Sequence, residues 1–346
     1  MSKTLQDYAT LINDTIQSNE INHYITTDNM CQNLGGIDTF KNINIPQGKV
    51  RSFQKDDVLL SNIRLYFRKV YRAKQKGGCS SDVLVFRAKH IDSTTLFAIL
   101  SSQIFTDYAC SGSQGSKMPR GNKTHMMDFK IPTINFTIAK IFNSIQNKIE
   151  NNHKINELLH TLAYKIYEYY FKYKPKNANL EQIIIENPKS SIMVKNAQKT
   201  QDKYPFFTSG DNILSYPKAI IDGRNCFLNT GGNAGIKFYV GKASYSTHTW
   251  CICANEFSDY LYLLLSSIKI HINQSFFQGT SLKRLQKNLL KKYPIYMPSV
   301  HEIKKFNQII MPLLTLISIN TRTSKKLEQI RDFLLPLLLK QQVKPQ

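Results

Sequence analysis

The sequence has 346 residues, 42% of them hydrophobic, which is enough for two globular domains that each bury a core. Its 46 lysines and arginines against 24 aspartates and glutamates give a net charge of +22, which favours a polyanionic partner, with nucleic acid as the first expectation. The longest apolar run, residues 309–319, is too short to span a membrane, and the N-terminus lacks the apolar core of a signal peptide. We therefore expect a cytoplasmic protein with no membrane partner.

The cysteines do not form the dense framework of a secreted protein. There are six, and the spacing of His248, Cys251 and Cys253 does not match that of a paired C-x2-C zinc site. Residues 247–253 are instead typical of a buried strand. We expect reduced structural thiols and no bound metal.

The first third of the chain predicts short strands and one helix. Its elements are an amphipathic piece at residues 5–16, a turn-prone stretch at 24–30, strands at 58–70 and 80–87, a helix at 96–108 and a polar loop at 111–123. Apolar and polar residues alternate in the strand at 58–70, so Arg64 and Arg68 would share one face. Ile131 and Pro132 then precede a long helix, since proline can start a helix but not continue one.

The long helix is predicted at residues 134–171. Its apolar residues recur at three- and four-residue spacings, as in a coiled-coil seam. The predicted seam consists of Ile138, Ile141, Ile145, Asn152, Ile155, Leu159, Leu162, Ile166 and Tyr169, with Lys148 and Ile149 sharing the remaining step. Because the intervening residues are polar, this stripe must pack against a partner helix.

A second strand-rich unit follows the helix break at residues 172–177. Its predicted elements are strands at 225–229, 236–240 and 243–253, a helix at 259–272 and a polar loop at 278–287. The segment NTGGNAG at 229–235 lacks the Lys-Ser/Thr ending of a phosphate-binding loop, and it predicts a tight turn between strands.

A second long helix is predicted at residues 300–340. Its stripe comprises Ile303, Phe306, Ile310, Leu313 or Leu314, Ile317, Leu327, Ile330, Leu334 and Leu337. Polar residues interrupt the stripe at 320–324, so each long helix has a polar break near its middle. Pro312 and Pro336 lie inside this helix and predict that it is bent or broken.

The two halves of the sequence match each other in order, at an offset of 164 to 166 residues. The matches pair Leu100, Ser101 and Ser102 with Leu265, Ser266 and Ser267; Gln114, Gly115, Ser116 and Arg120 with Gln278, Gly279, Thr280 and Arg284; and Ile131 and Pro132 with Met297 and Pro298. Collinear matches of this kind indicate an internal duplication of a strand-rich domain followed by a helix.

No arrangement of nucleophile, base or paired carboxylates stands out, whereas the basic residues fit contacts to phosphates and base edges. The predicted DNA-binding residues are Asn62, Arg64, Arg68, Lys69, Lys117, Arg120 and Lys123 in the first unit, and Lys237, Lys242, Tyr245, Lys283, Arg284 and Lys287 in the second. The aromatic residues Tyr66 and Tyr245 fit either the surface or the core, and Trp250 fits the core better.

Several runs of this sequence together resemble a known family. DDVLLSNIRLYFRKVYRA, GGCSSDVLVFRAK and SGSQGSKMPRGNK resemble a target recognition domain of the specificity subunit of type I restriction-modification systems. YPFFTSGDNIL followed by DGRNCFLNTGGNAGIKFYVGKASYSTHTW resembles another such domain, of a different subtype. The resemblance covers nearly the whole chain.

The resemblance implies an α/β (α+β) fold with a pseudo-two-fold internal repeat. It places target recognition domains at residues 1–133 and 179–299, separated by two long antiparallel coiled-coil helices at 134–178 and 300–346. It also implies double-stranded DNA with a bipartite target, two copies of a modification (methyltransferase) subunit and, through them, restriction (motor-nuclease) subunits as partners.

The same resemblance implies that this chain holds no cofactor and is not catalytic, and that the methyltransferase subunit binds S-adenosylmethionine. Two other interpretations of the sequence stay open. One is a stand-alone DNA- or RNA-binding structural protein without methyltransferase partners. The other is an enzyme whose site the sequence does not reveal.

Overall fold

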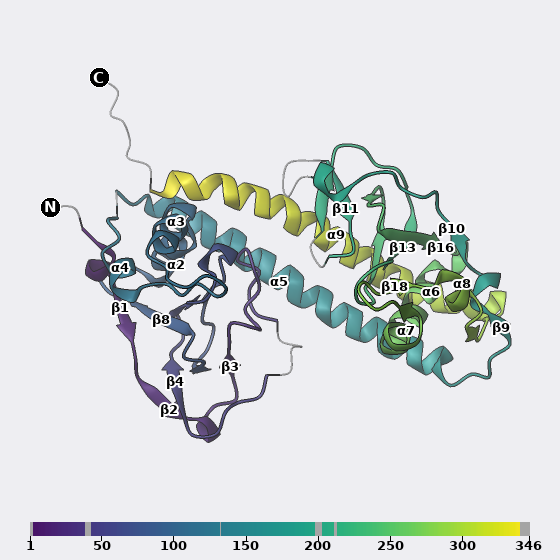
Figure 1. Cartoon of the computed structure of the whole chain (residues 1–346), viewed down its shortest axis with the longest axis horizontal. Coiled ribbons are helices and arrows are strands. Elements are labelled where there is room, and N and C mark those ends of the chain that lie inside the picture. Colours follow the sequence, from purple (N-terminus) through teal and green to yellow (C-terminus); the bar gives the residue numbers. More distant parts are fainter. Residues whose placement is uncertain (1–2, 39–42, 132, 198–202, 211–212, 340–346) are drawn as a thin grey trace. The chain divides into compact units, whose positions relative to one another are not determined.

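The computed structural model describes residues 3–38, 43–131, 133–197, 203–210 and 213–339. The chain forms two compact units, unit 1 (Met1–Asn151 and Leu327–Gln346) and unit 2 (Asn152–Lys326). Each unit combines strands and short helices with part of two long helices, α5 (Phe136–Tyr167) and α9 (Val300–Leu338) (Figure 1). The predicted mixed fold with two long helices is therefore confirmed.

Unit 1 contains two four-stranded sheets. The first has the order β1-β8-β5-β6, with β1 at Ala9–Ile12, β8 at Val83–Ala88, β5 at Val58–Ser61 and β6 at Val70–Arg72. The second has the order β2-β4-β7-β3, with β2 at Thr15–Gln17, β4 at Lys49–Phe53, β7 at Gly77–Cys79 and β3 at Tyr24–Ile25. Both faces of the first sheet are covered, which explains the continuous apolar run of Val58, Leu59 and Leu60.

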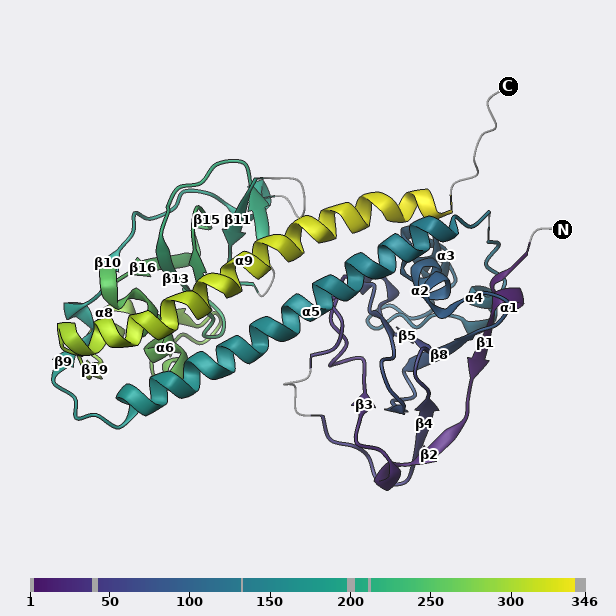
Figure 2. The same cartoon turned by 180° about the vertical axis from the view of Figure 1, so that it is seen from behind.

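Short helices cover the first sheet of unit 1. They are α1 (Leu5–Tyr8), α2 (Ser93–Ser101), α3 (Gln103–Ser111) and α4 (Lys123–Met127). The helix predicted at 96–108 is thus two helices, because the Ser102 side chain accepts a hydrogen bond from the Phe105 amide and starts a new helix. Phe97 of α2 packs against Phe142 of α5, with ring centroids 5.4 Å apart, which attaches this layer to the long helix (Figure 2).

Unit 2 repeats the topology of the first sheet. Its main sheet has the order β10-β16-β13-β14, with β10 at Ile185–Glu186, β16 at Thr249–Cys253, β13 at Arg224–Asn229 and β14 at Ile236–Val240. In both units this sheet is antiparallel. Its last strand is β6 in unit 1 and β14 in unit 2, and each of these pairs with the strand that precedes it in the chain, β5 or β13. The internal duplication predicted from the 164-to-166-residue offset is therefore confirmed at the level of topology.

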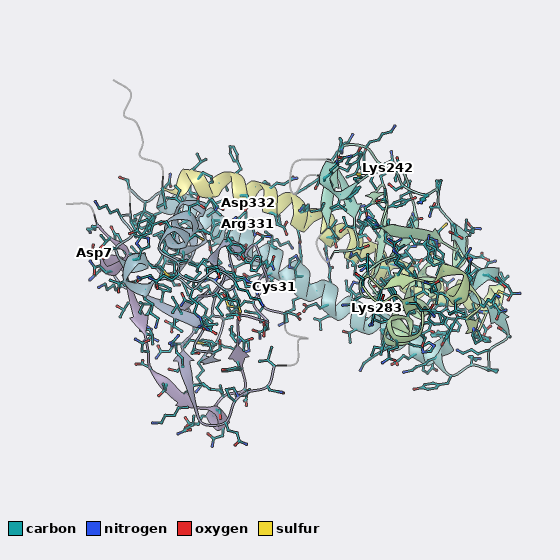
Figure 3. The ribbon with its side chains drawn as sticks, in the orientation of Figure 1. Asp7, Cys31, Lys242, Lys283, Arg331 and Asp332 are labelled. Carbon is teal, nitrogen blue, oxygen red and sulfur yellow. The ribbon has the colours of Figure 1, made fainter. Side chains whose placement is uncertain are left out.

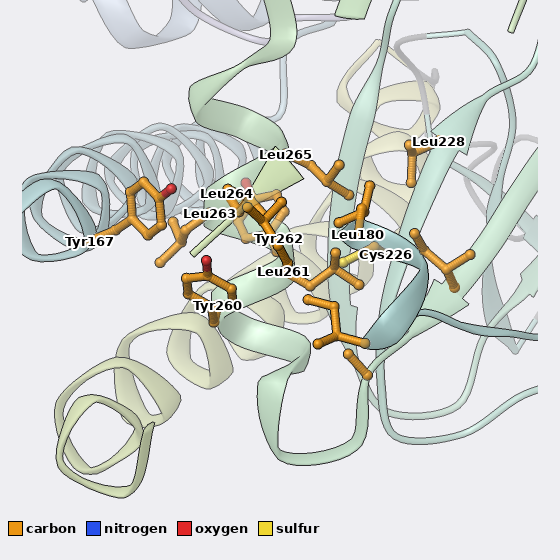
Figure 4. Close-up of a cluster of buried hydrophobic side chains, with 14 of the residues drawn as sticks. Tyr167, Leu180, Cys226, Leu228, Tyr260, Leu261, Tyr262, Leu263, Leu264 and Leu265 are labelled. Carbon is orange, nitrogen blue, oxygen red and sulfur yellow. The ribbon is translucent and has the colours of Figure 1, made fainter. Parts of the chain in front are cut away.

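The remaining elements of unit 2 surround that sheet. They are the three-stranded sheet β12 (Leu214–Tyr216), β11 (Tyr204–Phe207) and β15 (Ser244–Tyr245), the pairs β17 (Phe277–Gln278) with β18 (Arg284–Leu285) and β9 (Ala178–Asn179) with β19 (Pro294–Ile295), and the helices α6 (Ser258–Ser267), α7 (Lys269–Ser275) and α8 (Lys287–Lys291). The core lies between α6, β13 and the long helices, where Tyr260 contacts both Tyr167 and Phe171 (Figure 4).

Both long helices form close to the predicted ranges. α5 ends in a π-helical turn at Glu168–Lys172, and α9 continues through Pro312 and Pro336. The prediction of a broken second helix was wrong. Both prolines lie on the exposed side of α9, where water can satisfy the carbonyl groups that lose their helical partner.

The buried side of α5 differs from the predicted seam. Ile141, Ile155, Leu162 and Tyr169 are between 41% and 86% exposed. The buried residues are Ala139, Phe142, Gln146, Ile149, Asn152, Ala163 and Tyr167, of which the predicted seam contained Ile149 and Asn152. The apolar pattern missed part of this face because the face includes Gln146, a polar residue that is buried with a hydrogen-bonding partner on α9.

The two helices run antiparallel where they meet within each unit. In unit 2, Asn152 Nδ2 donates to Ser324 Oγ at 3.1 Å, and Asn320 Nδ2 donates to Asn156 Oδ1 at 3.0 Å. In unit 1 the Asn135 amide donates to the Leu338 carbonyl at 3.1 Å. The polar breaks predicted in the middle of both helices are therefore paired with each other.

The first half of α9 buries the stripe predicted for it, and the second half does not. Ile303, Phe306, Ile310, Leu314 and Ile317 are all buried in unit 2. Beyond the polar break Ile330 is 48% exposed, and the buried residues become Arg331, Leu335 and Leu338. A straight helix drifts relative to a seven-residue repeat, so a stripe extended across an interruption loses its phase.

No helix within the described residues is long and apolar enough to cross a membrane.

Candidate nucleic-acid interface

A hairpin between α3 and α4 carries two of the predicted cations of unit 1. Gln114 and Arg120 exchange backbone hydrogen bonds at 2.9 and 2.8 Å, and Gly115 has a φ of +101°, a conformation that glycine adopts without strain. Lys117 is exposed at the tip, and Arg120 forms an ion pair with Asp82 at 3.0 Å. We call residues 114–120 the first hairpin.

The first hairpin is fixed to the end of β5 through Arg64. The Arg64 amide donates to the Pro119 carbonyl at 2.9 Å, and its Nη2 donates to the Lys117 carbonyl at 3.2 Å. The adjacent Asn62 carbonyl accepts from the Gly121 amide at 3.1 Å. These bonds hold the basic tip in one position relative to the sheet.

The strand predicted at 58–70 is interrupted. A 3-10 turn at Leu65–Phe67 is flanked by Arg64 and Arg68, whose φ values of 51° and 49° lie in the left-handed region. Such backbone is strained for residues other than glycine, and it occurs here because residues 62–64 bond to the first hairpin instead of a strand partner. The turn leaves Tyr66 53% exposed, so this tyrosine belongs to the surface.

Three predicted contact residues of unit 1 point inward. Arg68 Nη2 donates to the Ser101 carbonyl at 2.8 Å, and burial lowers the pKa of its guanidinium. Asn62 is buried, and Lys69 Nζ donates to the Thr27 carbonyl. These three residues support the fold of the site, whereas Lys117, Arg120 and Lys123 are exposed.

Unit 2 has an equivalent hairpin at residues 278–284, which we call the second hairpin. Gln278 and Arg284 are paired, as Gln114 and Arg120 are, and Gly279 has a φ of +137°. The exposed Lys283 and Arg284 lie on its returning strand.

The turn at residues 229–235 packs against the second hairpin. The Gly232 amide donates to the Lys283 carbonyl at 2.9 Å, and the Leu285 amide donates to the Thr230 carbonyl at 3.1 Å. This segment connects β13 to β14, so its prediction as a turn between strands is confirmed. Each unit thus positions a basic hairpin at the same end of the same strand of its sheet.

The other predicted residues of unit 2 do not gather at the second hairpin. Lys242 is exposed at the far end of β14 from the 229–235 turn, and Figure 3 shows it apart from Lys283. Lys237 is half-buried, and its Nζ donates to the carbonyl groups of Thr208 and Gly210.

Lys287 and Tyr245, which were also predicted to contact DNA, are held by contacts within unit 2. Lys287 Nζ lies 5.0 Å from the centroid of the Trp250 ring, and burial lowers the pKa of this lysine. Trp250 is in the core, as expected. Tyr245 is 1% exposed and donates from its hydroxyl to the Pro188 carbonyl, so it is a core residue and not a DNA contact.

No group of three or more histidine, cysteine, aspartate or glutamate side chains in the described part of the chain could hold a metal ion. His248, Cys251 and Cys253 lie on or next to strand β16, and burial raises the pKa of the Cys251 thiol.

Comparison with known families identifies the second half of the chain. Residues 176–329 match the family described as "Type I restriction modification DNA specificity domain". Residues 176–329 correspond to a type I DNA specificity domain. This domain begins just before β9 and ends within α9, so it contains the second hairpin and the turn at 229–235. The family predicted from the sequence is thereby confirmed. No curated protein sequence matches the chain.

The fold of the whole chain, and not only of its specificity domain, is that of a solved type I subunit. The S subunit of a type I restriction-modification system from M. genitalium matches with a TM-score of 0.64 at 14% identity, covering 99% of this chain and 96% of that chain. The HsdS subunit from Thermoanaerobacter tengcongensis also matches, with a TM-score of 0.36 at 13% identity, covering 98% of this chain and 96% of that chain. The fold assignment rests on the first of these matches.

Proposed function

We propose that this chain is the DNA-recognition subunit of a type I restriction-modification complex, in which unit 1 and unit 2 each recognise one half of a bipartite target. The observation that carries the proposal is the pair of basic hairpins, one in each unit, in a chain whose second half matches a DNA specificity domain. A net charge of +22 adds the long-range attraction to DNA that such contacts require.

The hairpins have the chemistry for both kinds of DNA contact. The lysine and arginine side chains of the hairpins suit phosphates and the guanine edge, while the glutamines that open each hairpin, Gln114 and Gln278, suit the adenine edge. A two-stranded ribbon is also narrow enough to enter the major groove. We therefore place the DNA against the hairpin side of each unit.

We further propose that two copies of a methyltransferase subunit dock on the long helices and supply S-adenosylmethionine and the adenine chemistry, with restriction subunits joining through them. The support is an apolar stripe on the outer face of each helix. In unit 2 it comprises Ile155, Leu158 and Leu162 on α5 and Ile309, Leu316 and Ile319 on α9, each at least 41% exposed. A contiguous exposed apolar stripe on a helix favours a protein partner.

The test is to map methylated adenines across the genome of the host cell with the gene present, deleted and restored. We expect one divided motif to lose methylation on deletion and to regain it on restoration. An unchanged methylation pattern would overturn the proposal. Loss of an undivided motif would overturn the assignment of one half-target to each unit.

Purification of the chain from its host separates the partner proposal from the alternatives. A methyltransferase that copurifies in a two-to-one ratio is the expected result. A chain that binds DNA alone, with no such partner at native expression, would indicate a stand-alone DNA-binding protein.

A further inference from the structure

The tip of each hairpin carries a large apolar side chain that the protein leaves exposed. Met118 in the first hairpin is 54% exposed, and Leu282 in the second is 57% exposed. Single exposed apolar residues are common and need no explanation by themselves. These two are distinguished by their position, because they lie 164 residues apart, the same offset that relates Gln114 to Gln278 and Arg120 to Arg284.

The backbone of both tips is built in the same way. Gly115 and Gly279 have positive φ values of +101° and +137°, and each faces the carbonyl of the apolar residue three positions on. A Cβ atom at Gly279 would approach the Leu282 oxygen to 2.5 Å, and one at Gly115 would approach the Met118 oxygen to 3.5 Å. The turn therefore holds the apolar residue at the tip in both units.

The charges around the tips determine what can contact them. Lys117 and Arg120 flank Met118, while Lys283 and Arg284 directly follow Leu282. Arg120 forms an ion pair with Asp82 at 3.0 Å. A basic rim around an apolar tip fits a surface that is anionic outside and apolar inside, which describes a groove of DNA: phosphates at the edges, thymine methyl groups and base faces within.

We infer that Met118 and Leu282 are apolar contacts to the bases, each entering a DNA groove with its hairpin and packing against a thymine methyl group or an opened base step. Leucine and methionine are among the side chains that proteins insert between base steps, and apolar side chains also recognise the thymine methyl group. The inference rests on the proposed function and adds to it two residues that recognise base pairs by shape, without charge.

The test uses the full chain with its copurified partners, bound to a duplex that carries the mapped target. Met118→Ala and Leu282→Ala are each expected to weaken binding about five-fold, the loss for a side chain of this size that is only partly desolvated. The slope of log affinity against log salt should stay unchanged, because no charge is removed. Met118→Leu and Leu282→Met, which keep the apolar volume, should retain the affinity.

The matched control is Met193→Ala. Met193 is 53% exposed in unit 2 and lies on neither hairpin, so its removal should leave affinity unchanged. Thermal unfolding of all variants shows whether any of them has lost the fold. Because both tip residues are already more than half exposed, no change in the unfolding temperature is expected.

Two substituted duplexes distinguish the two kinds of base contact. One half-site has its thymines replaced by deoxyuridine, which lacks the methyl group. If the tip contacts that methyl group, the alanine substitution in the unit that reads this half-site should no longer lower the affinity. If the tip instead opens a base step, the fluorescence of 2-aminopurine placed in that half-site should increase on binding. Either result supports the inference, and the absence of both overturns it.

The outcomes separate this inference from the proposed function. If the parent complex does not distinguish the target from a scrambled duplex, the proposed function is wrong and the inference fails with it. If the parent distinguishes them and both alanine variants bind as it does, the inference alone is wrong. A loss in only one variant, or a loss accompanied by a changed salt slope, also overturns the shared apolar role.

Discussion

Arg331 of α9 donates a hydrogen bond from Nη1 to Oε1 of Gln146 on α5 at 3.1 Å, and both side chains are buried in unit 1. Arg331 Nε also donates to Asp332 at 3.0 Å, and Figure 3 labels both residues on α9. Gln146 Nε2 donates in turn to the Leu34 carbonyl at 2.5 Å. A buried polar network fixes one register between two helices, because sliding would separate Arg331 Nη1 from its acceptor on Gln146.

Gln146→Leu should therefore lower the free energy of unfolding of unit 1 by about 1–3 kcal/mol, since it removes the acceptor and leaves a buried donor unsatisfied. The double variant Gln146→Leu with Arg331→Met removes both members and should recover most of that loss. Urea unfolding measures both. The exposed Gln308→Leu on α9 is the matched control. Strict additivity of the two single changes would contradict a coupled pair.

Neutralising exposed hairpin cations should weaken DNA binding in a salt-dependent way. Lys117→Gln and Lys283→Gln should each lower the slope of log affinity against log salt by about one if the lysine contacts a phosphate. Lys154→Gln, on the exposed face of α5, should not change the slope. The buried Arg68 should behave differently, with Arg68→Gln reducing stability rather than the slope. Equal slopes for all four variants would contradict the hairpin interface.

Unit 2 should be exchangeable as a module. The chain enters and leaves the strand-rich part of unit 2 at one point, where the Met297 amide donates to Asn177 Oδ1 at 2.6 Å and Asn177 Nδ2 donates to the Met297 carbonyl at 3.2 Å. Replacing residues 178–296 with another specificity domain, while keeping Asn177 and Met297, should change one half of the methylated motif only. A change in both halves would show that the units do not act independently.

The long helices should set the spacing between the half-targets. The test inserts seven residues after Asn151 in α5 and seven after Lys326 in α9. Both insertions fall at the boundary between the units, so the contacts of Asn152 and Gln146 with α9, which lie within the units, stay intact. The pair lengthens by about 10 Å, which corresponds to roughly three base pairs of B-DNA. Mapped methylation should show a spacer longer by up to that amount. An unchanged spacer in an active complex would contradict this role.

Glu302 should make the stability of unit 2 depend on pH. Backbone and side-chain hydrogen bonds from Ser299, at the N-terminus of α9, lower the pKa of Glu302 from 4.5 to about 2. Since the folded state favours the carboxylate, its contribution is complete above pH 4.5 and is lost as pH falls towards 2. The free energy of unfolding of Glu302→Gln, measured by urea unfolding, should thus be lower than that of the parent at neutral pH. The difference between the two should vanish near pH 2. A constant difference would contradict this origin.

The sequence predicted the two long helices but not which side of them is buried. Apolar spacing in α5 points to Ile155 and Leu162, which are exposed, and it omits Gln146, which the structure buries. A pattern that counts apolar residues assumes that polar ones face water. This assumption fails where a buried amide bonds to a partner about 170 to 190 residues away, as the separations of 172 and 185 residues show here.

At the site, the repeat in the sequence was more informative than the individual basic residues. The matched positions Gln114 with Gln278 and Arg120 with Arg284 form the same pair in both hairpins. The same alignment also relates Met118 to Leu282. A selection of basic residues does not include this pair, because neither side chain is charged. Single residues such as Arg68 and Tyr245 could not be placed, because their burial depends on packing between segments distant in the chain.

The division of α9 between the two units has a consequence for protein synthesis. Leu335, Leu338 and Leu339 belong to the core of unit 1, together with Leu5 and Phe97. The ribosome makes most of unit 1 first, but releases these three leucines only after all of unit 2 has been translated. The whole of unit 2, whose strands and α9 segment are consecutive in the chain, is therefore synthesised before the last part of unit 1. The N-terminal half of this chain depends on its last helix, and a nonsense mutation after residue 326 would leave that half, rather than unit 2, with an unfinished core.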